Sequence, residues 1–362
     1  MVSLLIATLF ATHLGPMGAD EPAREPQLAA QGSRVALTFG AGSALYCSTS
    51  QDAGKTFAAP VKVADVAILP LNRHRGPRIA FAGDAIVITA VVGKTPSHEQ
   101  HAHGLPSDGD LIAWRSTNGG KNWSPGVVVN DAPGAPTEGL HALAGDGNGT
   151  LFAAWLDKRG AKGTRLYGAR SDDAGATWSK NVLIYQSPDG TICECCAPSA
   201  AIARDGQIAV MWRNWLGGSR DLYLTQSRDG VQFSTPQKLG NGTWQLNACP
   251  MDGGGLVVSA DRITTAWRRG DTVYLAEPAK PEIPLGRGND VALAVSRNRP
   301  YVIWSNDSRI ELWEEGRLAT LAQSGAFPAI TASPDGSLVA AWEENGQIVT
   351  TRLLARVPDG SR

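Results

Sequence analysis

The chain has 362 residues, of which 43% are hydrophobic and 19% are charged. This balance supplies enough apolar material for a large core and excludes an intrinsically disordered protein. The formal net charge of -1 excludes a field over the whole molecule that would attract nucleic acid or an anionic membrane surface, so a charged ligand must be bound locally.

An apolar run opens the chain and extends from Val2 to Leu14. It is followed by Gly15, Pro16 and a stretch of small residues, which is typical of a secretory signal peptide over residues 1–19. We therefore expect export, to the periplasm or the medium. The run has no preceding Lys or Arg, which leaves a misassigned start codon or a short buried strand as alternatives. No apolar run is long enough for a transmembrane helix, so no membrane span is expected.

From residue 25 onward, two short apolar segments around a Gly, Asp or Asn turn occur seven times. Each pair predicts a β-hairpin, and most pairs are followed by a third strand such as ALYCSTS or RLYGARS. Repeats at this spacing predict an all-β fold, a β-propeller of four-stranded blades, with seven blades favoured and six as the alternative. We expect a single domain over residues 25–355 and a short tail over residues 356–362.

In the first four repeats the third strand runs into a further motif. It reads STSQDAGKTF, RSTNGGKNWS, RSDDAGATWS and, in a shortened form, QSRDGVQFS. The motif resembles the Asp box, or BNR repeat, of sialidases and of many propellers that are not sialidases. The resemblance implies a structural turn on the side away from the ligand, in which backbone N–H groups donate to Asp52, Asn118, Asp173 and Asp229.

Strand direction divides the loops of each blade between two faces. Loops after the first and third strands share one face, and loops after the second and fourth strands share the other. Since the Asp-box motifs follow third strands, we expect the ligand on the opposite face. The loops of that face contain every histidine except His13 and every cysteine except Cys47, which we expect to be a buried thiol.

One interpretation of this face is a glycoside hydrolase that resembles the sialidases. Those enzymes bind a sugar carboxylate with three arginines, protonate the leaving group with an Asp and use a Tyr nucleophile activated by a Glu. No tyrosine falls in a loop of this face, so the expected nucleophile is missing. The candidate catalytic residues are Arg78, Asp157, Arg213 and Arg268, with Arg73, Arg75, Arg159 and Arg220 as further ligands of an acidic sugar.

A second interpretation is a soft-metal site that holds copper or zinc. A Cys-x-Cys-Cys run precedes the fourth hairpin and a Cys-x-Met pair precedes the fifth, so the two are expected to be neighbours. Thiolates and thioethers favour soft metals. A disulfide across the two links is the alternative in an oxidising compartment. The candidate ligands are Cys193, Cys195, Cys196, Cys249, Met251, His98, His101 and His103.

A third interpretation is a binding module whose concave face takes a glycan or another small anionic ligand. Trp215 lies among Arg213, Asn214 and Arg220 in one loop, where an indole would stack on a sugar ring. Fold alone does not rank binding against catalysis. Because the nucleophile is missing, we favour a ligand-binding or metal-binding scaffold over an active hydrolase.

Overall fold

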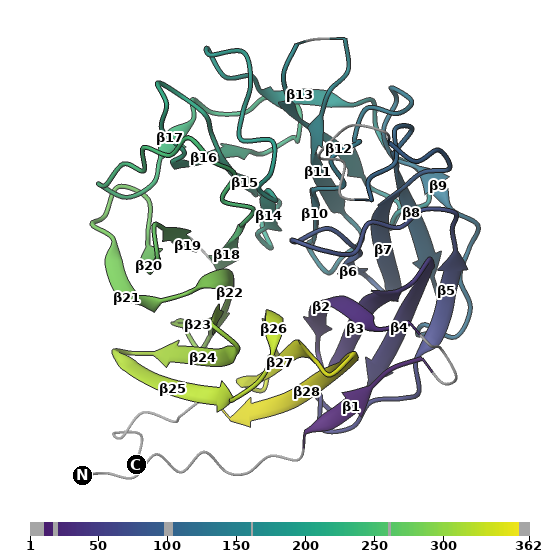
Figure 1. The fold of residues 1–362 in the computed structure, drawn as a ribbon. Coiled ribbons are helices and arrows are strands. Elements are labelled where there is room, and N and C mark those ends of the chain that lie inside the picture. Colours follow the sequence, from purple (N-terminus) through teal and green to yellow (C-terminus); the bar gives the residue numbers. More distant parts are fainter. Residues whose placement is uncertain (1–10, 17–20, 98–103, 161, 260–261, 355–362) are drawn as a thin grey trace.

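The computed structural model describes residues 11–16, 21–97, 104–160, 162–259 and 262–354. These residues form seven antiparallel sheets of four strands each, arranged around a central axis as the blades of a propeller (Figure 1). The prediction of an all-β propeller with seven blades is confirmed. No helix in the described part of the chain is long and apolar enough to cross a membrane.

Each blade places its first strand at the axis and its last strand at the rim (Figure 1). Blades one to three comprise β2 (Ala23–Gln31), β3 (Arg34–Ala41), β4 (Ala44–Ser50) and β5 (Val61–Asp65); β6 (Arg78–Ala82), β7 (Ala85–Val92), β8 (Asp110–Ser116) and β9 (Val127–Val128); and β10 (His141–Gly145), β11 (Leu151–Asp157), β12 (Arg165–Ser171) and β13 (Val182–Tyr185).

Blades four to six continue in the same order around the axis. They comprise β14 (Ser199–Ile202), β15 (Ile208–Arg213), β16 (Leu222–Ser227) and β17 (Gln237–Lys238); β18 (Gly254–Ser259), β19 (Arg262–Arg269), β20 (Thr272–Ala276) and β21 (Ile283–Arg287); and β22 (Asn289–Ser296), β23 (Arg299–Asn306), β24 (Arg309–Glu314) and β25 (Arg317–Ala322).

The seventh blade closes the ring with strands from both ends of the chain. Its inner three strands are β26 (Ala326–Ala332), β27 (Ser337–Glu344) and β28 (Gln347–Leu354), and its outer strand is β1 (Thr12–Leu14). Because β1 pairs antiparallel with β28, part of the segment predicted as a signal peptide supplies a strand of the fold. The structure thus contains a short strand in this segment, which was one of the two alternatives. A chain cut after residue 19 would lack it, and export remains a prediction.

The hydrophobic cores lie between neighbouring blades. The second strands β11 and β15 are buried along their whole length, because adjacent sheets cover both faces of each blade. This double cover explains why second strands read as continuous apolar runs in the sequence. Large aromatic side chains fill the space between blades, and four of them are at most 2% exposed: Trp155, Trp212, Trp267 and Trp304.

The motifs after the third strands of blades one to four form closed turns. In blade three, Asp173 Oδ1 accepts hydrogen bonds from Ser171 Oγ (2.9 Å) and from the backbone N of Thr177 (2.8 Å). The backbone N of Gly175 donates to Ser171 Oγ over 2.9 Å. These side chains therefore act inside the turn. The residues that accept the equivalent serine hydrogen bond in the other three turns are Asp52, Asn118 and Asp229.

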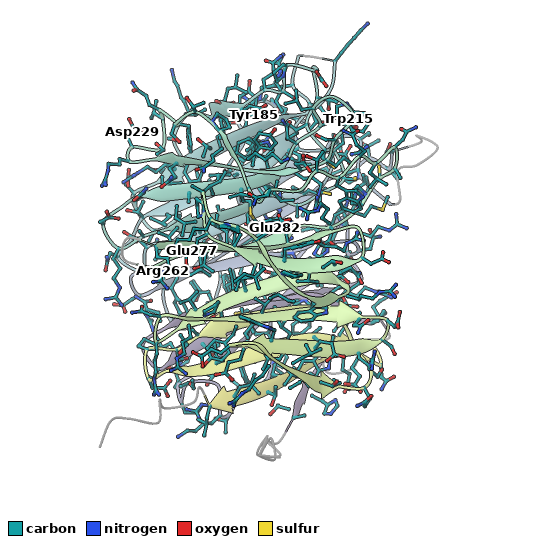
Figure 2. All side chains as sticks on the ribbon, turned by 90° about the vertical axis from the view of Figure 1, so that its left-hand side faces the viewer. Tyr185, Trp215, Asp229, Arg262, Glu277 and Glu282 are labelled. Atoms are coloured by element: carbon teal, nitrogen blue, oxygen red, sulfur yellow. The ribbon has the colours of Figure 1, made fainter. Side chains whose placement is uncertain are left out.

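The loops of each blade are divided between the two faces of the disc. Asp229 follows β16, the third strand of blade four, whereas Trp215 follows β15, the second strand. Figure 2, turned by a quarter turn from Figure 1, shows these two residues on opposite sides of the molecule. We name the side with the loops after second and fourth strands the loop face.

Candidate functional site

Three first strands carry a β-bulge at the same place, close to the axis on the loop face. The ladder register of β2, β22 and β26 shifts near the start of each strand. The residues at the bulges, Glu25, Asp290 and Phe327, have φ of 54°, 56° and 49°. A positive φ is costly for residues other than glycine, and such residues cluster at functional sites. The three bulges therefore mark a candidate site.

His74 lies among these residues and comes from the link between blades one and two. Its Nε2 lies 2.9 Å from Asp290 Oδ1 and 3.7 Å from Asp252 Oδ1. Its backbone N donates to Glu25 Oε1 over 3.1 Å, and its ring packs edge-on against the Phe327 ring, with centroids 5.7 Å apart. His74 also has a positive φ, of 66°. We name these five residues the axial site.

Burial controls the protonation of the axial site. It raises the pKa of Glu25 to about 7 and also raises the pKa of Asp252. Burial lowers the pKa of His74, but the hydrogen bond to Asp290 and the nearby carboxylates outweigh it and raise that pKa to about 9. The same hydrogen bond holds the pKa of Asp290 below its usual value despite burial. At neutral pH His74 is an imidazolium paired with the Asp290 carboxylate.

Two arginines border the axial site. Arg268 Nε donates to Asp252 Oδ2 over 2.6 Å, and its remaining nitrogens donate to two carbonyl oxygens. Arg78 donates to the carbonyl oxygens of His74 and Pro77. Among the described residues Arg78 has no carboxylate within ion-pair distance, whereas Arg268 does. Of these two arginines, Arg78 is therefore the one whose positive charge is available to pair with an anionic ligand.

A cavity of about 260 Å³ runs along the axis and is lined by all seven first strands. The side chains of His74, Arg78 and Asp290 belong to its wall. Its volume approaches the lower end of the range of about 300 to 1,000 Å³ found for small-molecule sites. Two cationic groups and one carboxylate thus face a space that a small polar group can enter.

Three of the predicted metal ligands come together in the link between β13 and β14. The Cys193 sulfur lies 3.7 Å from the Cys195 sulfur and 3.5 Å from the Cys196 sulfur. All three thiols are free and buried, and the half-buried Met251 packs against them. We name these four residues the sulfur cluster. It joins the link that precedes blade four to the link that precedes blade five through Met251, whereas Cys249 of the second link is not part of it.

Arginines surround the sulfur cluster. Arg220 Nη1 donates to Cys193 Sγ over 2.9 Å, and its guanidinium lies 4.3 Å from the ring centroid of Trp215. Arg213 is 2% exposed, donates to the carbonyl oxygens of Arg220 and Arg268, and has a buried Nε without a partner. Hydrogen bonds with the other two thiols lower the pKa of Cys193 despite burial, and the charges of both arginines lower it further.

Other predicted site residues are engaged within the fold. Asp157 is fully buried and accepts hydrogen bonds from Trp155 Nε1 (2.8 Å) and Arg159 Nε (3.0 Å). Arg75 is also buried, and its Nε donates to the backbone of Glu138 over 2.7 Å. Neither Asp157 nor Arg159 lines the axial cavity. The structure therefore does not bring the predicted proton donor to the axial site, because its carboxylate is used to hold Arg159 and the neighbouring tryptophan.

The remaining predicted ligands have different surroundings. Cys249 is exposed and forms no disulfide, and it is not among the three cysteines whose sulfur atoms lie within 4.8 Å of one another. The disulfide alternative is therefore not present in the structure. Arg73 is exposed and contacts the Met251 sulfur. Cys47 is a buried thiol in β4. His98, His101 and His103 lie outside the described residues.

The axial cavity has no tyrosine in its wall, as far as the described residues go. A Tyr and Glu pair does occur elsewhere, where Tyr301 Oη donates to Glu314 Oε1 over 2.8 Å. That pair lies near the turn between β22 and β23, on the side opposite to the loop face. Tyr185 Oη accepts a hydrogen bond from Asn214 Nδ2. The arrangement of a sialidase nucleophile is thus not found at the axis.

The central residues of the axial site are ones that the sequence analysis does not select. His74 and Asp252 stand in links between blades, and Asp290 stands at the start of β22, so all three lie on the loop face close to a first strand. Face assignment could have singled them out as titratable residues near the axis. Glu25 carries no such signal, because only the bulge in β2 separates it from an ordinary strand residue.

No protein-family model matches the sequence, and a search of curated proteins finds no match. Solved structures, in contrast, match over nearly the whole chain. A protein of unknown function from Dyadobacter fermentans DSM 18053 has a TM-score of 0.56 at 14% identity, with 96% of this chain and 98% of that chain covered.

Two further solved structures with this fold have assigned activities. The intramolecular trans-sialidase from Ruminococcus gnavus has a TM-score of 0.53 at 12% identity, with 96% of each chain covered. An ulvan lyase of family PL25, bound to -[GlcA(1-4)Rha3S]-, has a TM-score of 0.54 at 11% identity, with 95% of this chain and 96% of that chain covered. The chain thus has the fold of the sialidase-like propellers.

Proposed function

We propose that the protein is a carbohydrate-binding propeller that takes an acidic saccharide at the axial site. The observation that carries this proposal is the wall of the axial cavity. There Asp290 orients the His74 imidazolium, and Arg78 has no carboxylate within ion-pair distance among the described residues. The His74 side chain is 17% exposed, so it can reach a ligand while Asp252 stays buried. Arg78 lines the same cavity. A carboxylate or sulfate group suits two such cations.

The solved structures of similar fold support the carbohydrate class. One is an intramolecular trans-sialidase, and another is an ulvan lyase bound to -[GlcA(1-4)Rha3S]-. Sialic acid and glucuronic acid each carry a carboxylate, and the rhamnose of the second ligand carries a sulfate. Negative charge on the saccharide is thus common to these two cases, and it matches the cationic groups in the axial cavity.

Cleavage of the bound saccharide is a second candidate function, favoured by the backbone strain around His74. All four residues with positive φ at the axial site are residues other than glycine, and strained residues of this kind cluster at active sites. The His74 imidazolium could donate a proton to a leaving oxygen. Since no tyrosine lines the cavity in the described part of the chain, such cleavage would differ from the sialidase reaction.

Calorimetric titration of the full chain with 3′-sialyllactose, a glucuronate oligosaccharide and neutral lactose tests the proposal. We expect the acidic saccharides to bind at least about tenfold more tightly than lactose, because a charge-assisted hydrogen bond contributes roughly 1.5 to 3 kcal/mol. His74→Gln and Arg78→Met should each weaken acidic binding by about tenfold. Arg287→Gln is the matched control, since Arg287 is an exposed cation at the end of β21, on the same face.

Two outcomes would overturn the proposal. The first is equal affinity for lactose and for the acidic saccharides, and the second is unchanged affinity in both His74→Gln and Arg78→Met. Assay of new reducing ends by mass spectrometry addresses the second candidate. If the natural chain cleaves the saccharide and His74→Gln does not, the result supports catalysis at the axial site. If the saccharide stays intact with the natural chain, binding is the function.

A further inference from the structure

The sulfur cluster has the spacing expected of thiolates around one metal ion. Sulfur atoms bound about 2.3 Å from a common metal lie roughly 4 Å apart. The Cys193 sulfur lies 3.7 Å from Cys195 and 3.5 Å from Cys196, and all three sulfur atoms lie within 4.8 Å of one another. Small changes of side-chain torsion would therefore place a metal ion at bonding distance from all three.

The donor atoms of the cluster are all sulfur. Met251 packs against the three cysteines from the link that precedes blade five, so its thioether, which contacts Arg73, is the candidate for a fourth donor. Within the described ranges, no His, Asp or Glu joins the three thiols at metal-binding distance. Zinc sites are commonly completed by cysteine, histidine or a carboxylate, whereas thiolates with a thioether favour monovalent copper. The donor set thus favours Cu(I).

The charges around the cluster fit thiolates. Three thiolates and one Cu(I) carry excess negative charge, which is costly to bury without partners. Arg220 donates to Cys193 over 2.9 Å. Arg213 is buried; in the described part of the chain its hydrogen bonds go to carbonyl oxygens, its guanidinium lies over the Trp244 ring, and its Nε has no partner. A buried guanidinium without an ion pair is costly too, so a thiolate cluster beside it satisfies both groups.

We propose that Cys193, Cys195 and Cys196, with Met251 as a weaker fourth ligand, form a binding site for Cu(I). Each thiol releases its proton to solvent as its sulfur binds, and the copper keeps its oxidation state. This function is additional to saccharide binding, because none of the four residues lines the axial cavity. Copper binding and saccharide binding can therefore succeed or fail independently.

Competition between the reduced full chain and a chromogenic Cu(I) chelator, without oxygen, tests the proposal. We expect one Cu(I) per chain and an ultraviolet thiolate-to-copper band. Cys193→Ser should weaken binding by at least ~100-fold, because it removes the central thiolate, and Met251→Leu by about tenfold. Cys249→Ser and Cys47→Ser are the matched controls, since these cysteines lie outside the cluster, and they should bind Cu(I) as the natural chain does.

Three results would overturn the assignment. The first is Cu(I) binding no tighter in the natural chain than in Cys193→Ser. The second is a higher affinity for Zn(II) than for Cu(I) in parallel titrations. The third is a free-thiol count showing that two cysteines of the cluster are joined in a disulfide in the protein as isolated. Circular dichroism spectra of each variant show whether weaker copper binding comes from the missing ligand or from loss of the folded structure.

Discussion

Glu25 shows how one buried carboxyl group links the axial site to folding. It is 2% exposed, its Oε1 accepts the hydrogen bond from the His74 backbone, and its own backbone N donates to Glu343 Oε1 over 2.7 Å. Burial raises the pKa of Glu25 to about 7 and also raises the pKa of Glu343. The folded protein therefore holds a proton on Glu25 at pH values where the unfolded chain has released it.

Replacement of Glu25 by Gln should change the pH dependence of stability. Between pH 4.5 and 7 the folded state binds more protons than the unfolded state, so the free energy of unfolding falls as pH rises through this window. Because glutamine does not ionise, the free energy of unfolding of Glu25→Gln should fall less over this window, by up to about 3 kcal/mol. His74, whose pKa rises from 6.5 to about 9, continues the decline to pH 9. Urea unfolding at a series of pH values measures both effects.

Glu282→Gln is the control with the opposite sign. The Arg269 guanidinium lowers the pKa of Glu282, so this carboxylate contributes stability above pH 4.5 that is lost as the pH falls. Glu282→Gln should reduce stability at neutral pH and retain the decline between pH 4.5 and 7. An identical decline in Glu25→Gln and the natural chain would show that Glu25 is not the group responsible.

At the scale of elements, the turn after β12 connects two blades. Gly175 has φ of 82°, and a Cβ atom at this position would lie 3.0 Å from Cγ2 of Val87 in blade two. The turn thus requires glycine for two reasons, the positive φ and the close approach of β7. Ser171 and Asp173 hold the turn in this position through the hydrogen bonds described above.

Gly175→Val should destabilise the fold by roughly 1 to 3 kcal/mol, because a β-branched residue resists positive φ and the added carbons would collide with Val87. Thermal unfolding measures this loss as a lower Tm. Gly206→Val separates the two causes, since Gly206 has φ of 85° but a Cβ atom added there would have no neighbour within 4 Å. We expect a smaller loss for Gly206→Val. An unchanged Tm for Gly175→Val would refute the argument.

At the scale of the whole molecule, β1 brings the two ends of the chain together as the outer strand of blade seven. Leu14 is 6% exposed in the core between blades seven and one, and β1 covers the edge of β28. An uncovered strand edge exposes unpaired N–H and C=O groups and favours pairing with other chains. The closure of the propeller therefore includes a segment that the sequence pattern also presents as a signal peptide.

A chain lacking residues 2–19 should be less stable and more prone to associate. Loss of the buried Leu14 side chain costs about 2 kcal/mol, which lowers Tm by a few degrees. Thermal unfolding and light scattering of the natural and shortened chains measure the two effects. Mass spectrometry of the mature N-terminus then tests export. Cleavage after residue 19 together with an unchanged Tm would show that β1 is dispensable.

The sequence alone determined the repeat and the face of each loop, and it favoured seven blades over six. Hairpins arise from local signals, since apolar segments around a tight turn pair with each other wherever the blade lies in the ring. The face of a loop follows from antiparallel connectivity alone. For the same reason the proximity of Met251 to the three cysteines was predictable, because both links precede the first strands of successive blades.

Tertiary structure alone decided which side chains meet at the axis. His74 bonds to Asp290, which lies 216 positions away, and it reaches Glu25 only because a bulge turns that residue out of the ladder. The sequence pattern predicts Asp157 as a proton donor, but in the folded chain this carboxylate is buried and bound to Arg159. Pairings of this kind depend on ring closure and on local register shifts, and repeat patterns carry no information about either, because both arise from contacts distant in sequence.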